Sequence, residues 1–447
     1  MSNLLSIATR FRTSLFLFLC ILLGGTSQAV MGPKIILYVF STLIIGTFFF
    51  SYSKNDILKR PSLVTTLFII FIGYVLLQLL PLPSNIWTLL PGRGLIVQSF
   101  SAMDVALPWL PIAITPGKVL SALLSILPAL TLFLLAAHFA DKQEIRLALW
   151  SLLVAAALSL LLGVAQVISG MKSLYLYEIT NSIHPVGIFS NNNHQATLMA
   201  IAASFSIAHM INYNRMEQRS SRLPYVLCGF LTMAFLLALL LNGSSASYVL
   251  IMVVTVSLFV AFFVNGKQGG RRIGVLLCTA MVAIILVDFF LLGNTQKSFM
   301  HSLTDDGTTS RQEIFLTTWS IIKEHIIFGS GLGSFPTVYA SYEGVENITA
   351  SYVNHAHNDI LEFIMELGLV GLGIILGIIF WWLRSIRALF KTRSEFSHMA
   401  KAGAIVLLVI FVHSLIDYPI RTLTISSIAG LSAGLLQRGS NSLKEEL

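Results

Sequence analysis

A short stretch of this sequence gathers the residue types that carry out proton transfer. Two histidines stand in Asn354-His355-Ala356-His357-Asn358-Asp359, and Glu362 and Glu366 follow. Asp359, Glu362 and Glu366 are spaced i, i+3 and i+7, so they share one face of a helix. A histidine with a pKa near neutrality can accept a proton from a hydroxyl group at physiological pH. The stretch is a candidate for acid–base chemistry; the alternative is a solvated loop end whose carboxylates cap a helix.

His355, His357 and Asp359 also form an alternating set of possible zinc ligands. A spacing of two residues brings all three to one ion only if the chain is extended. No further pair of histidines or cysteines completes such a site in the sequence. We therefore predict chemistry that needs neither a metal nor another cofactor.

Arg311 opens a segment, 311–328, whose pattern predicts an amphipathic helix. Its planar guanidinium group can bind a phosphate through two parallel hydrogen bonds. The alternative for Arg311 is a salt bridge to Asp305 or Asp306. Lys323, on the same predicted helix, is expected to be solvated.

A further set of ionisable residues lies at the outer end of a predicted membrane span. His413 and Asp417 are spaced i, i+4, and Arg421 follows them closely. Ionisable groups in membrane spans are costly, so they indicate a functional site by default. The alternative is a network that braces a helical hairpin. Asn193 and His194 stand at the start of another predicted span.

The composition defines the elements that must position these side chains. Hydrophobic residues make up 55% of the 447 residues and charged residues only 11%, whereas soluble domains average about 25% charged. Apolar runs of roughly 17–22 residues match the length of a membrane-spanning helix. This pattern excludes a globular enzyme with a single membrane anchor, and it excludes a transmembrane barrel. We predict an all-α polytopic membrane protein with about 12 transmembrane helices, at 14–31, 35–52, 62–82, 118–138, 149–169, 194–212, 224–241, 247–264, 273–292, 366–383, 402–418 and 422–437.

The basic residues predict the orientation of these spans. Most of the 28 Lys and Arg residues fall in the segments that are inside if both termini are cytoplasmic, as the positive-inside rule requires. This placement explains the net charge of +8 without a nucleic-acid partner. Arg10, Arg12, the apolar stretch 15–23 and Ser27-Gln28-Ala29 also fit a cleaved signal peptide, which would leave the remaining topology unchanged.

The predicted topology divides the chain into three parts. A transmembrane bundle of about nine helices covers 1–292, a large outside loop covers 293–365, and about three C-terminal helices cover 366–447. A loop of this length is expected to be a functional element that contains short amphipathic helices. The chain has no P-loop and no nucleotide-binding glycine fingerprint. We therefore expect any chemistry to occur outside, without a nucleotide.

Three motifs of the loop and of the span after it resemble the bacterial O-antigen ligase and polymerase family. They are Gly329-Ser330-Gly331-Leu332-Gly333-Ser334-Phe335, Asn354–Asp359 and Glu366-Leu367-Gly368-Leu369-Val370-Gly371. The ligase motif of that family is a His followed by Asn, Ser or Gln, nine residues, then Gly-x-x-Gly. His357 and Asn358 begin such a motif here, and Gly368 and Gly371 complete it.

Two other segments, 187–196 and 412–419, also resemble stretches of that family. This chain departs from the family at two places. Family members often carry Ser-Arg where this sequence reads Gly243-Ser244-Ser245-Ala246-Ser247, and Arg where Asn192 stands. Both arginines are candidates for binding phosphate. Because this chain lacks them, Arg311 and Arg421 become the stronger candidates for that role.

The resemblance implies a glycosyltransferase in the bacterial inner membrane with its large loop in the periplasm. The donor would be a glycan on undecaprenyl diphosphate, and the acceptor a lipid A-core sugar or another glycan, among membrane lipids. His357 would be the base, with inversion at the anomeric carbon, and Arg311 would hold the diphosphate. The expected substrate-binding residues are His355, Asn358, Asn193, His194, Arg421, Asp417 and His413.

Two alternatives remain open at the level of the sequence. The same motifs fit a repeat-unit polymerase of the same family, which the motif spacing favours slightly less than a ligase. A secondary transporter or lipid flippase is an alternative of another class, because about twelve spans is a common number in transporters. That class has interrupted helices and charges at mid-membrane, whereas only Asp288 falls deep in a predicted span here.

Overall fold

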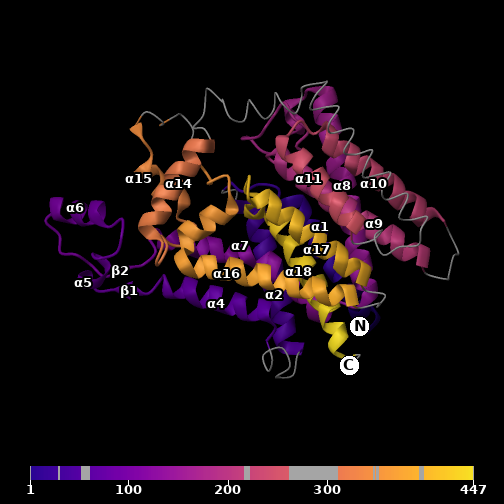
Figure 1. Cartoon of the computed structure of the whole chain (residues 1–447), viewed down its shortest axis with the longest axis horizontal. Helices are drawn as coiled ribbons and strands as arrows, with labels where there is room; N and C mark the ends of the chain where they lie inside the picture. Colours follow the sequence, from indigo (N-terminus) through magenta and orange to yellow (C-terminus); the bar gives the residue numbers. More distant parts are fainter. Residues whose placement is uncertain are drawn as a thin grey trace. The chain divides into compact units, whose positions relative to one another are not determined.

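The computed structural model describes residues 2–28, 31–51, 61–215, 222–260, 311–345, 348, 352–391 and 397–445. In these ranges helices predominate, joined by loops and one two-stranded sheet (Figure 1). The chain forms two compact units, each built from segments distant in the sequence. Unit 1 comprises 1–48, 127–301 and 384–447, and unit 2 comprises 49–126 and 302–383.

The helices of unit 1 overlap the predicted spans, although α1 begins and ends earlier than the predicted span 14–31. They are α1 (Ser2–Leu23), α2 (Met31–Ser51), α8 (Lys142–Ser169), α9 (Asn192–Arg215), α10 (Leu223–Leu241), α11 (Ser245–Leu258), α17 (Ser397–Ser414) and α18 (Leu423–Glu445), with the π-helical turn η1 (Leu135–Phe139) and the 3-10 turns η2 (Lys172–Leu174) and η6 (Pro419–Arg421). The predicted span 273–292, including Asp288, lies outside the described residues.

The ends of α8 show how the sequence sets these boundaries. The Asp141 side chain accepts a hydrogen bond from the backbone amide of Glu144 at 2.7 Å, which satisfies one of the donors that a helix start leaves open. At the other end Gly170 adopts a left-handed conformation with φ +63°, which ends the helix.

Small residues let the helices of unit 1 approach closely. In α18, Gly430 and Gly434 are one helical turn apart, and a Cβ atom on either would collide with the backbone around Ala129 or Phe133 of α7 (Pro116–Leu134). Such spacing of small residues is typical of helix packing in membranes. α9 packs against α8, α10, α11 and α17, and α1 packs against α8 and α18 (Figure 1).

Unit 2 builds its core from α4 (Leu63–Leu77), α14 (Arg311–His325), α15 (Phe335–Tyr342) and most of α16 (Asp359–Lys391). Between α4 and α7 the chain forms β1 (Pro81–Leu82), α5 (Ser84–Trp87), α6 (Gly94–Ala102) and β2 (Leu110–Pro111). β1 and β2 pair antiparallel, with Pro81 opposite Pro111. One apolar cluster joins α14, α15 and the start of α16, and another joins α4, α7 and α16.

α14 has the amphipathic pattern expected of 311–328. Its buried side chains, Ile314, Thr318, Ile321, Ile322 and His325, recur at intervals of three or four residues. The helix ends at His325, three residues before the predicted end. The carbonyl of Ile326 instead accepts the backbone amide of Leu369 at 2.7 Å, so the chain leaves the helical hydrogen-bond pattern there.

A break in α16 at Gly368 organises the glycine-rich turn of residues 329–333. Gly368 has φ +60° and ψ −143°, so the helical ladder is interrupted and carbonyls of the preceding turn become available. The carbonyl of Met365 accepts the amide of Ser330, and that of Glu366 accepts the amide of Gly331, both at 3.0 Å. The first glycine of the Gly-x-x-Gly motif is therefore the point at which this turn is attached to α16.

We expect Gly368→Ala to destabilise unit 2. Alanine would adopt an unfavourable positive φ, and its Cβ would lie 2.6 Å from the carbonyl oxygen of Ile326. The expected loss is about 2–4 kcal/mol, measured as a lower midpoint of thermal unfolding of the purified protein. Gly373→Ala is the matched control, because Gly373 is in the same helix with nothing within 4 Å of a Cβ. Equal midpoints for the two variants would contradict the prediction.

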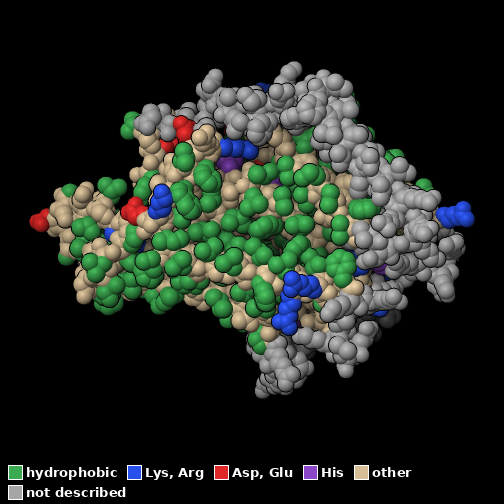
Figure 2. Space-filling model, in the orientation of Figure 1, with side chains coloured by type: hydrophobic (Ala, Val, Ile, Leu, Met, Phe, Trp, Pro, Cys, Tyr) green, Lys and Arg blue, Asp and Glu red, His purple; other side chains and the backbone are tan. Residues whose placement is uncertain are grey.

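The apolar helices identify a multi-pass membrane protein. In the part of the chain that the structure describes, five helical segments are long and apolar enough to cross a membrane: Pro116–Phe139, Lys142–Ser169, Leu223–Leu241, Asp359–Phe390 and Ser397–Ser414. Three shorter apolar helices in the same ranges cover Gly32–Phe48, Leu63–Leu77 and Ser245–Leu258. Hydrophobic side chains cover much of the described surface in Figure 2. The all-α membrane class agrees with the sequence, whereas twelve crossings, the periplasmic loop and the three-part division stay predictions.

Candidate functional site

In unit 2 the His355 side chain is held by a buried carboxylate. Its Nδ1 atom lies 3.0 Å from Oε1 of Glu362, one turn into α16, and the Glu362 side chain is 1% exposed. The other carboxylate oxygen accepts the backbone amide of Ala356 at 2.9 Å. Glu362 therefore fixes both the His355 ring and the backbone that leads to His357.

This contact has a chemical consequence for His355. A carboxylate accepts hydrogen bonds and favours the tautomer that carries its hydrogen on Nδ1. The lone pair of the neutral ring is then on Nε2. The contact resembles the histidine–carboxylate pair of a catalytic triad, in which the carboxylate fixes the orientation and the tautomer of the ring.

His357 occupies a strained position directly before α16. Its φ is +50°, in the left-handed region that residues other than glycine rarely adopt. Such a conformation costs on the order of 1–3 kcal/mol, and such residues cluster at functional sites. His357 is half-buried.

Asn358 caps the helix that follows His357. Its Oδ1 atom accepts the backbone amides of Ile360 and Leu361, both at 3.0 Å. This contact fixes where α16 begins and therefore where His357 lies relative to it. Whether Asn358 also binds substrate stays a prediction.

The three carboxylates of this stretch face the protein interior. Asp359, Glu362 and Glu366 are 5%, 1% and 0% exposed, so they do not form the solvated helix start that the sequence left as an alternative. The Glu366 side chain accepts the backbone amide of Gly333 at 2.9 Å. Two of the carboxylates on this helical face therefore hold neighbouring segments. Glu362 holds the histidine loop, and Glu366 holds the glycine-rich turn.

We expect Glu362→Gln to lower the rate of the reaction by about 10- to 100-fold or more. The carbonyl oxygen of glutamine would still accept the backbone amide of Ala356, so the amide nitrogen would face Nδ1 of His355 and donate to it. This favours the His355 tautomer with its hydrogen on Nε2, and a wrong tautomer strongly reduces catalysis in related arrangements. Turnover and its pH profile are the measurement. Glu178→Gln, at an exposed carboxylate between α8 and α9, is the matched control. Unchanged turnover and pH profile would exclude a positioning role for Glu362.

Arg311, the predicted phosphate ligand, is the first residue of α14 and is exposed. Asp305 and Asp306, its alternative partners, lie outside the described residues. Lys323 is exposed, as predicted. An exposed arginine at a helix start is accessible to an anionic ligand, and its role as a phosphate ligand stays a prediction.

In unit 1 a second polar cluster joins α9 to the segment after α17. The side-chain amide of Asn193 donates to Oδ2 of Asp417 at 2.6 Å, although the residues are 224 positions apart. The Ser244 hydroxyl, just before α11, donates to Oδ1 of Asn193. Asp417 is fully buried and Asn193 is 8% exposed. Asn193 therefore links three segments that are distant in the sequence.

His413 and His194 belong to the same cluster. His413 lies 2.6 Å through Nδ1 from the Thr197 hydroxyl and 3.8 Å through Nε2 from Asp417. The His194 ring, 1% exposed, packs edge-on against Tyr418 with centroids 5.2 Å apart and lies 6.4 Å from the His413 ring. The predicted i, i+4 pair is thus part of a packed polar network, which also fits the bracing alternative. Arg421 lies in η6 and is half-buried.

Side chains of α8 hold the turn that leads into this cluster. Gln166 accepts the amide of Gly187 and donates to its carbonyl oxygen, both at 2.9 Å. Ser159 accepts the amide of Ile188 at 3.2 Å and donates to Gln195 at 2.6 Å. Gly187 has φ +57°, and a Cβ there would collide with Ser159. These contacts fix the start of α9, where Asn193 and His194 lie.

Residues 228–376, about a third of the chain, match the family model described as O-antigen ligase. This segment belongs to the O-antigen ligase family. A comparison with curated proteins finds no match. The family indicates a membrane enzyme of glycan transfer, of the O-antigen ligase or polymerase type, with a lipid-linked glycan and an acceptor as general partners.

The O-antigen ligase segment contains part of the predicted site. Arg311, His355, His357 and Asn358 lie within it, and all four belong to unit 2. The other five predicted residues lie outside the matched segment and belong to unit 1: Asn193, His194, His413, Asp417 and Arg421. The predicted residues are thus divided between the two units. In unit 2, contacts hold His355 at Glu362 and order the start of α16 at Asn358. In unit 1, contacts join Asn193 and His413 to Asp417.

The structure adds residues to the site that the sequence analysis did not assign. Glu362 had a signal, because it shares a helical face with Asp359 and Glu366 shortly after the histidine loop. Thr197 is i+4 from Asn193 and therefore on the same face of α9. Ser244 and Gln166 had no such signal, because their partners are far away in the sequence. Among the described residues, no group of three or more His, Cys, Asp or Glu side chains is arranged to hold a metal ion.

Proposed function

We propose that this protein is a periplasm-facing glycosyltransferase of the O-antigen ligase type in the bacterial inner membrane. It transfers a glycan from undecaprenyl diphosphate to an acceptor sugar hydroxyl, with inversion and without a metal. Both termini are cytoplasmic in this proposal. The acceptor is the lipid A-core sugar of lipopolysaccharide or a related surface glycan.

The observation that carries the proposal is the histidine loop within the O-antigen ligase segment. His357 is half-buried with a strained backbone at the start of α16, and two buried carboxylates hold the loop and the neighbouring turn. Strain that is maintained by surrounding contacts is typical of catalytic positions. A diphosphate is a good leaving group, so the reaction needs a base for the acceptor hydroxyl and cations for the departing phosphates.

Each predicted residue has a role in this proposal. His357 removes the proton from the acceptor hydroxyl as that oxygen attacks the anomeric carbon and the bond to the diphosphate breaks. His355 and Asn358 orient His357 or the acceptor, and Arg311 stabilises the negative charge of the diphosphate. Arg421 is a second candidate for binding the diphosphate. Asn193, His194, His413 and Asp417 bind substrate in this proposal.

Reconstitution of the purified protein in lipid tests the proposal. Undecaprenyl-diphosphate repeat units are supplied once alone and once with lipid A-core acceptor, and the products are sized on a gel. Transfer only in the presence of the core identifies a ligase. A ladder of products from the donor alone identifies the repeat-unit polymerase of the same family and overturns the ligase assignment. Transport of donor across the bilayer without transfer would indicate the flippase alternative.

A further inference from the structure

A segment of unit 2 extends from the ends of two apolar helices. Residues 83–109 lie between β1, which follows α4, and β2, which precedes α7. α4 is apolar, and α7 opens a segment that is long and apolar enough to cross a membrane. β1 pairs with β2, and the backbone amide of Ala113 donates to the carbonyl of Gln78 at 2.9 Å. Both ends of this segment, the apolar extension, therefore lie together beside the end of α4.

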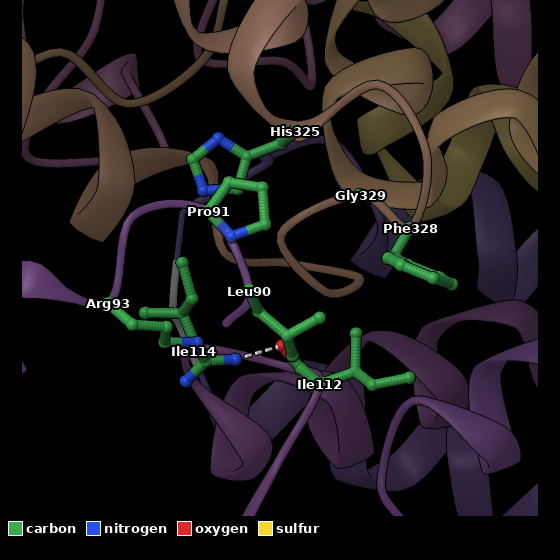
Figure 3. Close-up of a pocket in the computed structure, with 8 residues that line it drawn as sticks. All are labelled: Leu90, Pro91, Arg93, Ile112, Ile114, His325, Phe328 and Gly329. Carbon is green, nitrogen blue, oxygen red and sulfur yellow. Dashed lines mark hydrogen bonds between the residues drawn. The ribbon is translucent and has the colours of Figure 1, made fainter. Parts of the chain in front are cut away.

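The base of the apolar extension is fixed by buried side chains. Arg93 is 4% exposed and donates to the carbonyl oxygens of Pro111 and Ile112, and Figure 3 shows the bond to Ile112. Trp87 is fully buried, and its Nε1 donates to the carbonyl oxygen of Pro108 at 2.8 Å. Both contacts join the first part of the extension to the chain that leads into α7. The extension is therefore held in a defined position and is not a free loop.

α6, in the middle of the apolar extension, receives little support from the rest of unit 2. None of its nine residues is buried, and it lies apart from α4, α14 and α16 in Figure 1. An isolated helix shorter than about 12 residues is marginal in water, because its nucleation is costly. The order of α6 therefore requires a surface that the described residues do not supply.

The exposed part of the apolar extension carries large apolar side chains and little charge. Leu89 is 83% exposed and Trp109 is 66% exposed. Arg93 and Asp104 are the only charged residues in the sequence of the extension, and Arg93 is buried. The further exposed large apolar side chains are Ile86, Leu95, Met103 and Val105. Exposed apolar surface of this kind marks a contact with a membrane or with another protein.

The lipid bilayer is the surface that fits this position. Along the chain, exposed apolar side chains continue from the last turn of α4, at Leu76 and Leu77, through Leu80 to the extension. Exposed apolar side chains of a membrane helix face lipid, so the extension prolongs a lipid-facing surface. Tryptophan is enriched at the head-group level of membranes, which suits the exposed Trp109. A protein interface, in contrast, has a polar rim, for which this surface offers few charged groups.

We propose that the apolar extension lies in the surface of the lipid bilayer, with Leu95, Met103 and Trp109 in contact with lipid. Burial of apolar surface drives this contact. Anionic lipid is not required, because Asp104 is the one exposed charged residue of the extension. The proposal concerns membrane contact alone and does not depend on the proposed glycan transfer.

Spin labelling of the full-length protein in nanodiscs of phosphatidylcholine tests the proposal. The native cysteines are replaced by alanine, and one cysteine is introduced as Met103→Cys or as Gln312→Cys, at an exposed polar position of α14. Collisions with oxygen, which concentrates in the bilayer, and with a water-soluble nickel complex report the surroundings of each label. The ratio of oxygen to nickel accessibility should be several-fold higher for the Met103→Cys label than for the Gln312→Cys label.

The other possible results overturn the proposal in distinct ways. Equal ratios for the two labels would place the apolar extension in water. Low accessibility of the Met103→Cys label to both reagents would show a protein contact, with a partner or with a second copy of the chain. A high ratio only in nanodiscs that contain phosphatidylglycerol would show that charge, and not apolar surface, drives the contact.

Substitutions in the apolar extension separate lipid contact from folding. Leu95→Asp with Trp109→Asp should lower the ratio at Met103→Cys to that of Gln312→Cys, because charge opposes contact with lipid. Both replaced side chains are exposed, so this variant should accumulate as the wild type does. Asp104→Asn, which adds no charge, is the matched control and should keep the high ratio. An unchanged ratio in the doubly substituted variant would overturn the proposal. The label is read without donor or acceptor lipids, so a failure of glycan transfer is a separate result.

Discussion

Replacement of His357 by alanine is expected to lower glycan transfer by about 10²- to 10⁴-fold, the range that a general base contributes. The acceptor hydroxyl would then lose its proton only to water, while the contacts that hold the loop remain. Those contacts, from Glu362 to His355 and to the amide of Ala356, do not involve the His357 side chain. The measurement is single-turnover transfer by the reconstituted variant.

The control for this prediction is that the variant inserts, accumulates and unfolds normally. Alanine relieves none of the backbone strain at φ +50° and removes no buried side chain, so His357→Ala should insert, accumulate and unfold as the wild type does. Lys323→Ala, at an exposed cation outside the candidate site, should retain full activity. Turnover of His357→Ala at the wild-type rate would refute the base assignment. A transporter with its site at mid-membrane should also tolerate the change.

Replacement of Asp417 by alanine is expected to cause the largest loss of stability in unit 1, about 3–5 kcal/mol. Asp417 is fully buried and accepts the Asn193 amide at 2.6 Å, with His413 at 3.8 Å. Alanine would remove the acceptor of a buried donor and leave a cavity. The midpoint of thermal unfolding in detergent, and the fraction of protein that remains monodisperse, are the measurements.

Asp417→Asn distinguishes the charge from the hydrogen bond. Asparagine retains the size and one acceptor oxygen, so it should cost clearly less stability than alanine. If the cluster also binds substrate, as proposed, Asp417→Asn should raise KM for the donor while the protein stays folded. If the alanine variant is as stable as the wild type, the contacts of Asp417 do not brace unit 1. If the asparagine variant has unchanged kinetics, the cluster has a structural role alone.

Composition and spacing determined the class of this protein and much of its local structure. Hydrophobic runs predicted helices because a helix satisfies its own backbone hydrogen bonds, which is a local property of the chain. Spacing i, i+3 and i+7 placed Asp359, Glu362 and Glu366 on one face for the same reason. The motif from His357 to Gly371 pointed to the family that the match on 228–376 supports.

Only the tertiary structure decided what these residues contact. Helical periodicity does not reveal that Gly368 breaks α16 or that the freed carbonyls receive the glycine-rich turn, because that break depends on a segment about 40 residues earlier in the chain. The pairing of Asn193 with Asp417 spans 224 positions. The burial of Arg93 against two backbone carbonyls likewise has no sequence pattern. Local periodicity determines which face of a helix a residue occupies, whereas its partner depends on how distant segments pack.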